Sequence, residues 1–214
     1  MKSRWLGTTV AVAMWVFALA VYARLPERIP SHWNLHGEVD GWMGRGGAFL
    51  FPALAVGMMA LMWMLPRLDP RRRHIEQFRD DWRLMVNLLV GFFAVMEVAT
   101  LGYALGWPVD VDRVVLASMG LMLAGVGNYL PRVRSNWFMG IRTPWTMDNE
   151  RVWRATHRVG GRVFVACGLV LAASVLLPAH LRGWIVGAVV VTAAAVPIGY
   201  SYLAWRRDAA GRPL

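Results

Sequence analysis

The chain has 214 residues, of which 57% are hydrophobic and 12 are Trp, an apolar content above what a soluble domain of this length needs for its core. Its formal net charge of +10 would suit a nucleic-acid-binding protein. The basic residues, however, flank apolar runs, where membrane proteins carry them to set their topology. The composition therefore excludes an ordinary soluble domain and predicts no direct contact with nucleic acid.

Six charge-poor apolar runs are long enough to cross a bilayer, which takes about 20 residues as a helix. They are residues 5–23, 46–66, 84–109, 114–131, 163–179 and 183–205. Helices are expected and not barrel strands, because the runs lack the alternation of apolar and polar residues that barrel strands show. The predicted fold class is all-α, a polytopic membrane bundle of six transmembrane helices.

Lys and Arg are shared unevenly between the two sets of loops. The N-terminus, the second loop, the fourth loop and the C-terminus hold 18 of the 23 basic residues, and the other three loops hold 5. Basic residues accumulate on the cytoplasmic side of membrane proteins. We therefore expect a multi-pass protein of the cytoplasmic (inner) membrane, in contact with the lipid bilayer, with both termini cytoplasmic.

The first outer loop, residues 24–46, is rich in Pro and Gly, so we expect it to be structured but not helical. His32, His36 and Asp40 are spaced like metal ligands on a helix, but without a helix they predict no metal site. Trp33 and the histidines are expected to pack at the level of the lipid headgroups. The candidate contact residues of this extracytoplasmic loop are His32, Trp33, Asn34, Gly37 and Asp40.

The second loop, residues 67–84, carries Ile75, Phe78 and Trp82 on one face of a helix. This pattern predicts an interfacial amphipathic helix on the inner leaflet, or a short extension of the third span. Neither form implies chemistry.

Glu97 lies near the middle of the third apolar run, where an unpaired carboxylate is costly. We expect it to face the bundle, with Thr100 and Tyr103 placed to hydrogen-bond it. A proton or ligand role and a purely structural role both stay open. Two Gly-x-x-x-Gly pairs, at residues 102–106 and 183–187, fit close helix packing, although such matches are weak in a glycine-rich chain.

The fourth loop, residues 132–162, is polar, rich in Trp and Arg, and lies between two apolar runs. We expect an ordered turn over residues 140–145, and then a helix over about 148–159, capped by Asp148 and stopped by a Gly pair. Asn149, Trp153 and His157 would form one stripe on this helix. The alternative is that the Trp residues are interface anchors and the arginines only set topology. The candidate partner- or ligand-binding residues are Asn136, Gly140, Arg142, Thr143, Pro144, Trp145, Asn149, Trp153, His157 and Arg158.

The fourth loop resembles the SdpI family, immunity proteins to a secreted sporulation-delaying toxin. The resemblance rests on Asn136, on the Gly-Ile-Arg-Thr-Pro-Trp-Thr run over 140–146, and on the pattern of Asn, Glu, Trp, Thr, His, Arg and paired Gly over 149–161. The first outer loop, over residues 25–41, resembles the N-terminal domain of unknown function often joined to that family. With six similarly placed spans, the resemblance covers nearly the whole chain.

The expected organisation has three parts. Residues 1–66 form an N-terminal two-helix unit with the extracytoplasmic loop 24–46. Residues 67–84 form a cytoplasmic interfacial segment. Residues 85–214 form an SdpI-like four-helix unit with the cytoplasmic loop 132–162.

The resemblance implies a non-enzymatic immunity and signalling protein that confers resistance to a secreted antimicrobial peptide. In the best-known member the protein also sequesters a transcriptional repressor at the membrane, so the implied partners are a secreted toxin peptide outside and a transcriptional repressor inside. The alternative is a membrane-embedded enzyme or small-molecule transporter that uses Glu97 and the fourth loop. The chain has no standard enzyme signature, so no catalytic residue, cofactor or metal is predicted.

Overall fold

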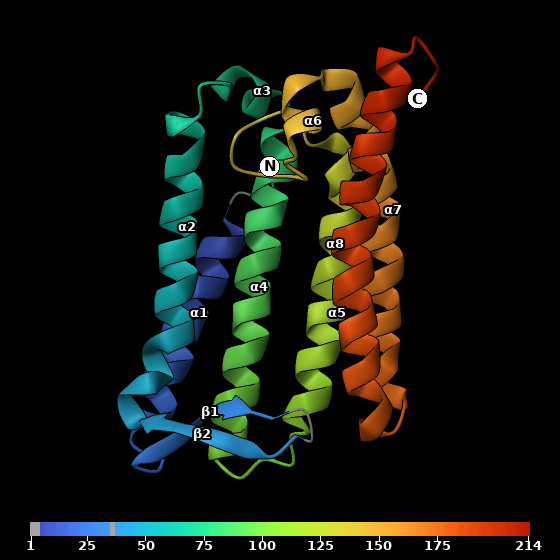
Figure 1. The fold of residues 1–214 in the computed structure, drawn as a ribbon. Helices are drawn as coiled ribbons and strands as arrows, with labels where there is room; N and C mark the ends of the chain where they lie inside the picture. Colours follow the sequence, from blue (N-terminus) through green and yellow to red (C-terminus); the bar gives the residue numbers. More distant parts are fainter. Residues whose placement is uncertain (1–4, 35–36) are drawn as a thin grey trace.

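The computed structural model describes residues 5–34 and 37–214 and shows a bundle of long helices with a β-hairpin across one end (Figure 1). Within these residues the long helices are α1 (Leu6–Tyr22), α2 (Leu50–Leu68), α4 (Arg79–Ala104), α5 (Val111–Tyr129), α7 (Glu150–Ala173) and α8 (Ala179–Ala209). The shorter elements are β1 (Arg28–Trp33), β2 (Val39–Gly44), α3 (Arg72–Gln77), α6 (Pro144–Asp148) and the 3₁₀ turns η1 (Arg45–Phe49), η2 (Leu130–Arg132) and η3 (Ser174–Leu176).

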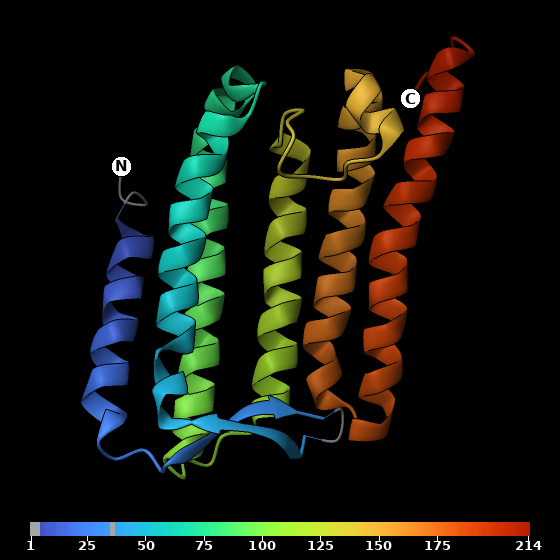
Figure 2. The same ribbon diagram turned by 60° about the vertical axis from the view of Figure 1, so that its left-hand side comes forward.

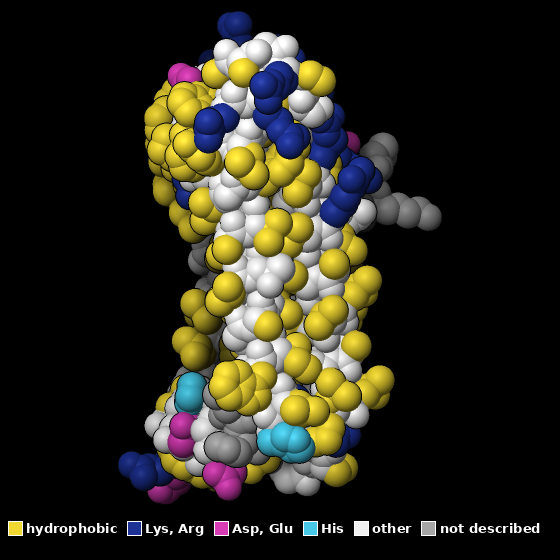
Figure 3. Space-filling view, turned by 45° about the vertical axis from the view of Figure 1, so that its right-hand side comes forward, with side chains coloured by type: hydrophobic (Ala, Val, Ile, Leu, Met, Phe, Trp, Pro, Cys, Tyr) yellow, Lys and Arg dark blue, Asp and Glu magenta, His cyan; other side chains and the backbone are white. Residues whose placement is uncertain are grey.

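The long helices have the length and surface of membrane spans. In the described part of the chain, five are long and apolar enough to cross a membrane, and α1, at 17 residues, lies at the lower limit. Large apolar side chains point outward along the bundle, for example Trp184 at 79% and Val191 at 65% exposure. Figure 3 shows apolar side chains along the middle of one face, with Lys and Arg gathered at one end. The predicted all-α polytopic bundle is confirmed.

The two ends of the bundle differ. We call one the basic end: it carries α3, α6 and the C-terminus, and it is the end nearer the start of α1 (Figures 1 and 2). The other is the hairpin end, where β1 and β2 pair antiparallel, with Arg28 opposite Gly44 and Pro30 opposite Trp42. The start of α1 and the end of α8 therefore lie toward the same end of the bundle, as an even number of spans requires, and the assignment of that end to the cytoplasm stays a prediction.

Helix α4 packs against α1 and α2 along its length. Midway along the bundle, Val90 of α4 packs with Met14 of α1 and with α2. Near the hairpin end, Leu101 of α4 packs with Ala18 of α1 and with Ile29 of β1, which is fully buried. The hairpin is thereby fixed to the ends of two spans.

Helices α5 and α7 approach so closely that only glycine fits at two levels. A Cβ added to Gly120 would lie 2.5 Å from the carbonyl oxygen of Gly168, and one added to Gly127 would lie 2.7 Å from that of Gly161. Small residues permit this backbone approach, which gains the van der Waals contact that holds helices together in lipid. Helix α7, which supports the fourth loop, is therefore held firmly on α5.

Two sequence-based expectations about α7 need correction. The helix predicted over residues 148–159 does not stop at the Gly pair, because α7 continues to Ala173. Both glycines are buried, and a Cβ on Gly160 would lie 2.3 Å from Ile141, so close packing outweighs their low helix propensity. The N-cap is Asn149, not Asp148. In the Gly-x-x-x-Gly pairs, a Cβ on Gly102 would meet Trp107 of its own turn, and Gly106 and Gly187 have nothing within 4 Å.

Two loops have more structure than the sequence predicted. The outer loop is not helical, as expected, but its extended segments pair as the β1–β2 hairpin. The segment 67–84 combines both expected forms, since α3 is a separate short helix and Trp82 lies on the extension of α4. The apolar residues Ile75, Phe78 and Trp82 are all buried in one cluster.

Gly120→Ala should destabilise the bundle by about 1–3 kcal/mol, because the added methyl group overpacks the contact with α7. The matched control is Gly91→Ala, which adds a methyl group where nothing lies within 4 Å and which slightly favours the helix. Thermal loss of helical circular dichroism in detergent should separate the two variants. Equal melting temperatures would show that α5 and α7 do not pack through this glycine.

Candidate functional site

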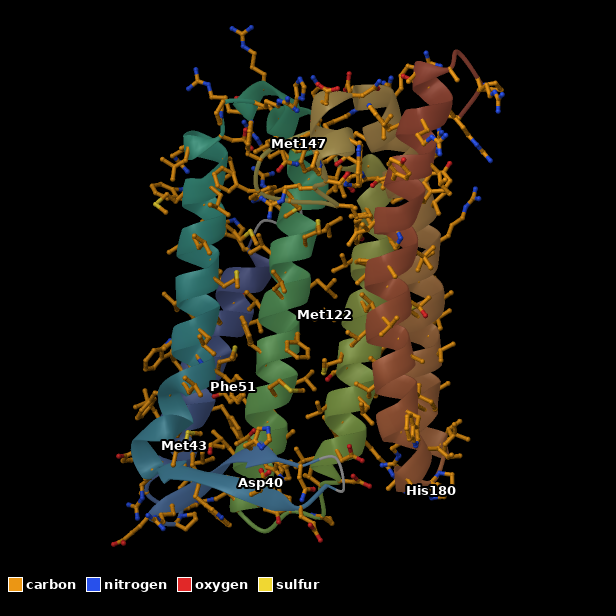
Figure 4. All side chains as sticks on the ribbon, in the orientation of Figure 1. Asp40, Met43, Phe51, Met122, Met147 and His180 are labelled. Atoms are coloured by element: carbon orange, nitrogen blue, oxygen red, sulfur yellow. The ribbon has the colours of Figure 1, made fainter. Side chains whose placement is uncertain are left out.

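The segment that connects α5 to α7, residues 133–149, is a folded structure at the basic end, and we call it the basic-end loop. It includes α6, and its side chain Met147 lies at that end in Figure 4, opposite Asp40 and Met43 at the hairpin end. Five of its residues are buried, the apolar Val133 and four polar residues, Ser135, Asn136, Thr143 and Thr146. A loop that only reverses the chain direction would not bury polar side chains in this way.

Asn136 holds the first turn of the loop together. Its side chain is fully buried. The Oδ1 atom accepts hydrogen bonds from the N–H groups of Phe138 at 2.9 Å and Met139 at 2.7 Å. The Nδ2 atom donates to the carbonyl oxygens of Arg134 at 2.8 Å and Met139 at 3.0 Å. One side-chain amide therefore pairs with four backbone groups, which explains why the position carries Asn. Asn136 holds the fold of the loop and does not face outward.

The loop is bound by two side chains that lie one turn apart on α7, Trp153 and His157. Both are fully buried and their rings stack at 4.0 Å between centroids. The Nε1–H of Trp153 donates to the carbonyl of Val133 at 2.8 Å. The Nε2 atom of His157 accepts from the N–H of Ile141 at 3.0 Å, and its Nδ1–H donates to the carbonyl of Trp153 at 2.8 Å. These partners require the neutral Nδ1–H tautomer, because a proton on Nε2 would face the Ile141 N–H.

Gly140 is required by the close approach of the loop to this ring pair. Its φ is +119°, a backbone conformation that residues with a side chain rarely adopt. A Cβ at this position would lie 2.4 Å from Nε2 of His157 and 3.0 Å from the ring of Trp153. Any other residue would push Ile141 off its histidine.

The second half of the loop is a capped turn. Thr143 is extended, as the following Pro144 predicts, and its hydroxyl accepts from the N–H of Thr146 at 3.2 Å. The hydroxyl of Thr146 in turn accepts from the N–H of Thr143 at 2.8 Å, which completes a capping box. The Thr143 hydroxyl also donates to Ser201 of α8 at 3.1 Å, so the turn is fastened to the last span.

The junction with α7 is fastened to α8 as well. Asn149 caps α7 through Oδ1 and donates from Nδ2 to Asp208 at 2.7 Å. The ring of Trp145 packs against Tyr202 with 5.2 Å between centroids. The loop therefore rests on α7 and α8 together.

The loop also contacts the other half of the bundle, through the segment between α2 and α4. The buried carboxylate of Asp69 accepts from the N–H of Trp137 at 2.9 Å and from that of Arg71 at 2.7 Å. The side chain of Arg71 donates to the hydroxyl of Ser135, and His74 donates to the carbonyl of Ser135 at 2.8 Å. Sequence reasoning missed Asp69, Arg71 and His74, because no local pattern marks residues that meet a loop more than 60 positions away.

The predicted site residues thus divide into two sets. The framework set is buried or half-buried and consists of Asn136, Gly140, Thr143, Trp145, Asn149, Trp153 and His157. The outward set is exposed and consists of Arg142, Pro144 and Arg158. Arg142 donates to the carbonyl of Trp137, which anchors one guanidinium nitrogen and leaves the rest of the group outward. Of the predicted stripe, Trp153 and His157 face the loop, and Asn149 contacts Asp208 of α8.

Glu97 is 1% exposed, in agreement with the expectation that it faces helices and not lipid. Neither carboxylate oxygen has a hydrogen-bond partner within the described residues, so the expected bonds from Thr100 and Tyr103 are not made. Tyr103 instead makes an edge contact with Trp33 of β1 at 5.9 Å. Glu97 lies roughly 27 Å along α4 from its first residue at the basic end, so it shares no site with the loop.

At the hairpin end, the outer-loop residues form a compact polar turn. Nδ1 of His32 lies 2.5 Å from Oδ1 of Asp40, and both side chains are accessible. Asn34 accepts from the N–H of Glu38 at 3.0 Å, and Gly37 has a φ of +81°. His36 lies outside the described residues. In the part of the chain described, no three His, Cys, Asp or Glu side chains come together as a metal site would need.

A second feature of the hairpin end is a polar cavity of about 470 Å³ beside Gly37. It is lined by Asp110, Asp112 and Arg113 of the α5 start and by the turn between α7 and α8. Arg182 of α8, 6% exposed, pairs with Asp112. The hairpin tip therefore reaches from the first two spans to the start of α5.

Comparisons with known protein families match two stretches of the chain, one near its start and one in its second half. The model of the SdpI/YfhL protein family matches residues 132–201, from the basic-end loop into α8. The model of a domain of unknown function (DUF1648) matches residues 9–56, from α1 through the hairpin into α2. The Immunity protein SdpI of Bacillus subtilis (strain 168) is 24% identical over 172 residues, which cover 80% of this chain and 81% of that protein. No solved structure matches the chain.

Asn136→Ala should loosen the basic-end loop, because four backbone groups lose their partner at a cost of roughly 1–3 kcal/mol. Limited trypsin digestion of the protein in lipid nanodiscs should then cleave at Arg134 and Arg142 faster than in the wild type. Asn128→Ala, at an exposed position of α5, is the matched control and should digest like the wild type. Unchanged cleavage of Asn136→Ala would contradict the framework role.

Proposed function

We propose, because this chain belongs to the SdpI family, that it is a membrane immunity protein that protects its cell from a secreted peptide and reports the peptide to a cytoplasmic partner. The similarity to an immunity protein over four fifths of the chain supports the protective role. The observation that carries the proposal is the basic-end loop, which the family model covers and which holds the outward Arg142 on a buried framework.

In this proposal the basic end faces the cytoplasm and the hairpin end faces outward. The excess of Lys and Arg at the basic end supports this orientation. Labelling of Ser31→Cys by a membrane-impermeant thiol reagent added outside the cell tests it, since Ser31 is exposed on β1. Absence of labelling in intact cells, with labelling after lysis, would reverse the orientation.

The hairpin end is the proposed contact for the secreted peptide. His32, Asp40 and the 55% exposed Trp42 lie on one hairpin, and the cavity beside Gly37 adds the charges of the α5 start. Aromatic and paired charged groups on a fixed hairpin suit recognition of a peptide at the membrane surface.

The basic-end loop is the proposed contact for the cytoplasmic partner, with a transcriptional repressor as the expected class. The outward Arg142 of the loop and the outward Arg158 of the adjoining α7 would make the contact, since guanidinium groups form paired hydrogen bonds with carboxylates. The framework residues Asn136, Trp153 and His157 would act by position, because they are fully buried.

An enzyme or transporter that combines Glu97 with the loop is the less favoured alternative. The carboxylate and the ring of His157 lie toward opposite ends of the bundle, and a single catalytic site needs such groups within hydrogen-bond reach. The family relationship also favours a protein without enzymatic activity.

The test is deletion of the gene from its host, followed by challenge with a panel of secreted antimicrobial peptides. Deletion should raise sensitivity to at least one peptide, and re-expression should restore resistance. A membrane pull-down with and without that peptide should then recover a cytoplasmic partner only with it. Unchanged sensitivity to every peptide would sink the immunity role.

The double variant Arg142→Gln, Arg158→Gln should reduce partner recovery at least about tenfold, because each lost charge-assisted bond contributes about 1.5–3 kcal/mol. Its abundance in the membrane should stay normal, since both side chains are exposed. Arg207→Gln, an exposed arginine near the end of α8, is the control. If the double variant recovers the partner like the wild type, the arginines only set topology.

A further inference from the structure

A cavity of about 580 Å³ lies at the basic end between α1, α2, α3 and α4, and no residue of the basic-end loop lines it. Its upper rim carries four arginines and one acid: Arg67, Arg72, Arg79, Arg83 and Glu76. Its floor is apolar and reaches Met59 of α2 and Val86 of α4. The cavity therefore combines a cationic mouth with an apolar base.

The rim arginines differ in their acidic partners. Arg83 lies 3.1 Å from Asp80, and Arg79 lies 4.0 Å from Glu76. Within residues 5–34 and 37–214, no carboxylate lies within ion-pair distance of Arg67 or Arg72. The mouth of the cavity therefore has a net positive charge, which favours the binding of an anion.

Arg67 is also held in place. Its guanidinium lies over the ring of Trp63 at 3.5 Å from the centroid and donates to the carbonyl of the same residue. Stacking on an aromatic face fixes the plane of the guanidinium and leaves its other N–H groups for an anion. An arginine that only sets topology would extend freely into water.

The walls of the cavity are fixed by two bonds between helices. The Nε1–H of Trp82 on α4 donates to the carbonyl of Met62 on α2 at 3.0 Å. The N–H of Gly7 on α1 donates to Oδ1 of Asn87 on α4 at 3.0 Å. A Cβ on Gly7 would come within 2.7 Å of that oxygen, so the helices meet closely below the cavity. The space is a feature of the fold and not of side-chain placement alone.

We propose that this cavity binds a phospholipid, with the phosphate held by Arg67 and Arg72 and the start of an acyl chain lying on the apolar floor at Met59 and Val86. Its volume falls within the range of about 300–1,000 Å³ typical of small-molecule sites. Guanidinium groups bind phosphate through paired hydrogen bonds, and basic pockets between membrane helices bind lipid headgroups. Trp63 lies at the mouth, where aromatic rings mark the interface between headgroups and hydrocarbon. Topology explains the number of arginines but not their convergence on a cavity.

Native mass spectrometry of the detergent-purified full chain tests the proposal, with short-chain phosphatidylglycerol as the probe. Glycerol phosphate tests for a free phosphate site, and a short-chain diacylglycerol tests for apolar binding alone. Arg67→Gln, Arg72→Gln should weaken phosphatidylglycerol binding at least about tenfold. Trp63→Ala, which removes the stacking surface of Arg67, should weaken it as well. The matched control is Arg206→Gln, Arg207→Gln, which removes two arginines of α8 that lie at the same end of the bundle. It should bind phosphatidylglycerol within about twofold of the wild type.

Selective loss in the cavity variants, with weak binding of glycerol phosphate and of diacylglycerol, would support a phospholipid site. Equal loss in the α8 control would reduce the binding to general electrostatic attraction and overturn the proposal. Glycerol phosphate that binds as tightly as the lipid would assign the cavity to a soluble anion and overturn the lipid assignment. Wild-type binding by both cavity variants would also overturn it.

Discussion

The hydrogen bond from the Ile141 N–H to the buried imidazole of His157 is the interaction on which the basic end depends. It fixes a loop to a transmembrane helix through a ring that has no contact with solvent. The bond requires a neutral ring, which stacks on Trp153. It also requires glycine at position 140, because a larger residue would collide with the two rings. The loop is therefore a docked structure and not a tether between spans.

The rest of the bundle holds this contact in place. Helix α7 lies on α5 through glycines at two levels, so the helix that carries His157 cannot shift without losing its backbone packing. Thr143 and Asn149 fasten the loop to α8, and Asp69 fastens it to the segment before α4. Buried polar groups of this kind are costly unless every bond is made, so the framework is held as a unit. Its outward arginines are then presented in a fixed arrangement, which is what a binding surface needs.

The spans and the folded character of the fourth loop could be predicted from the sequence, because lipid demands long apolar helices and because the Trp- and Arg-rich run is too specific for a plain turn. The roles within the loop could not. Trp153 and His157 form the predicted stripe, but which side of α7 faces protein depends on a loop whose path no periodicity describes. The predicted helix end at Gly160 was wrong, because a glycine that ends an isolated helix can also permit close packing inside a longer one.

Amide hydrogen exchange of the protein in lipid nanodiscs tests the docking of the loop most directly. The N–H groups of Trp137, Met139 and Ile141 each have a side-chain acceptor, so they should exchange at least about a hundredfold more slowly than the amide of Leu214 at the C-terminus. Exchange of these three amides as fast as that of Leu214 would show that the loop is not docked on His157, and the account of the basic end would fail.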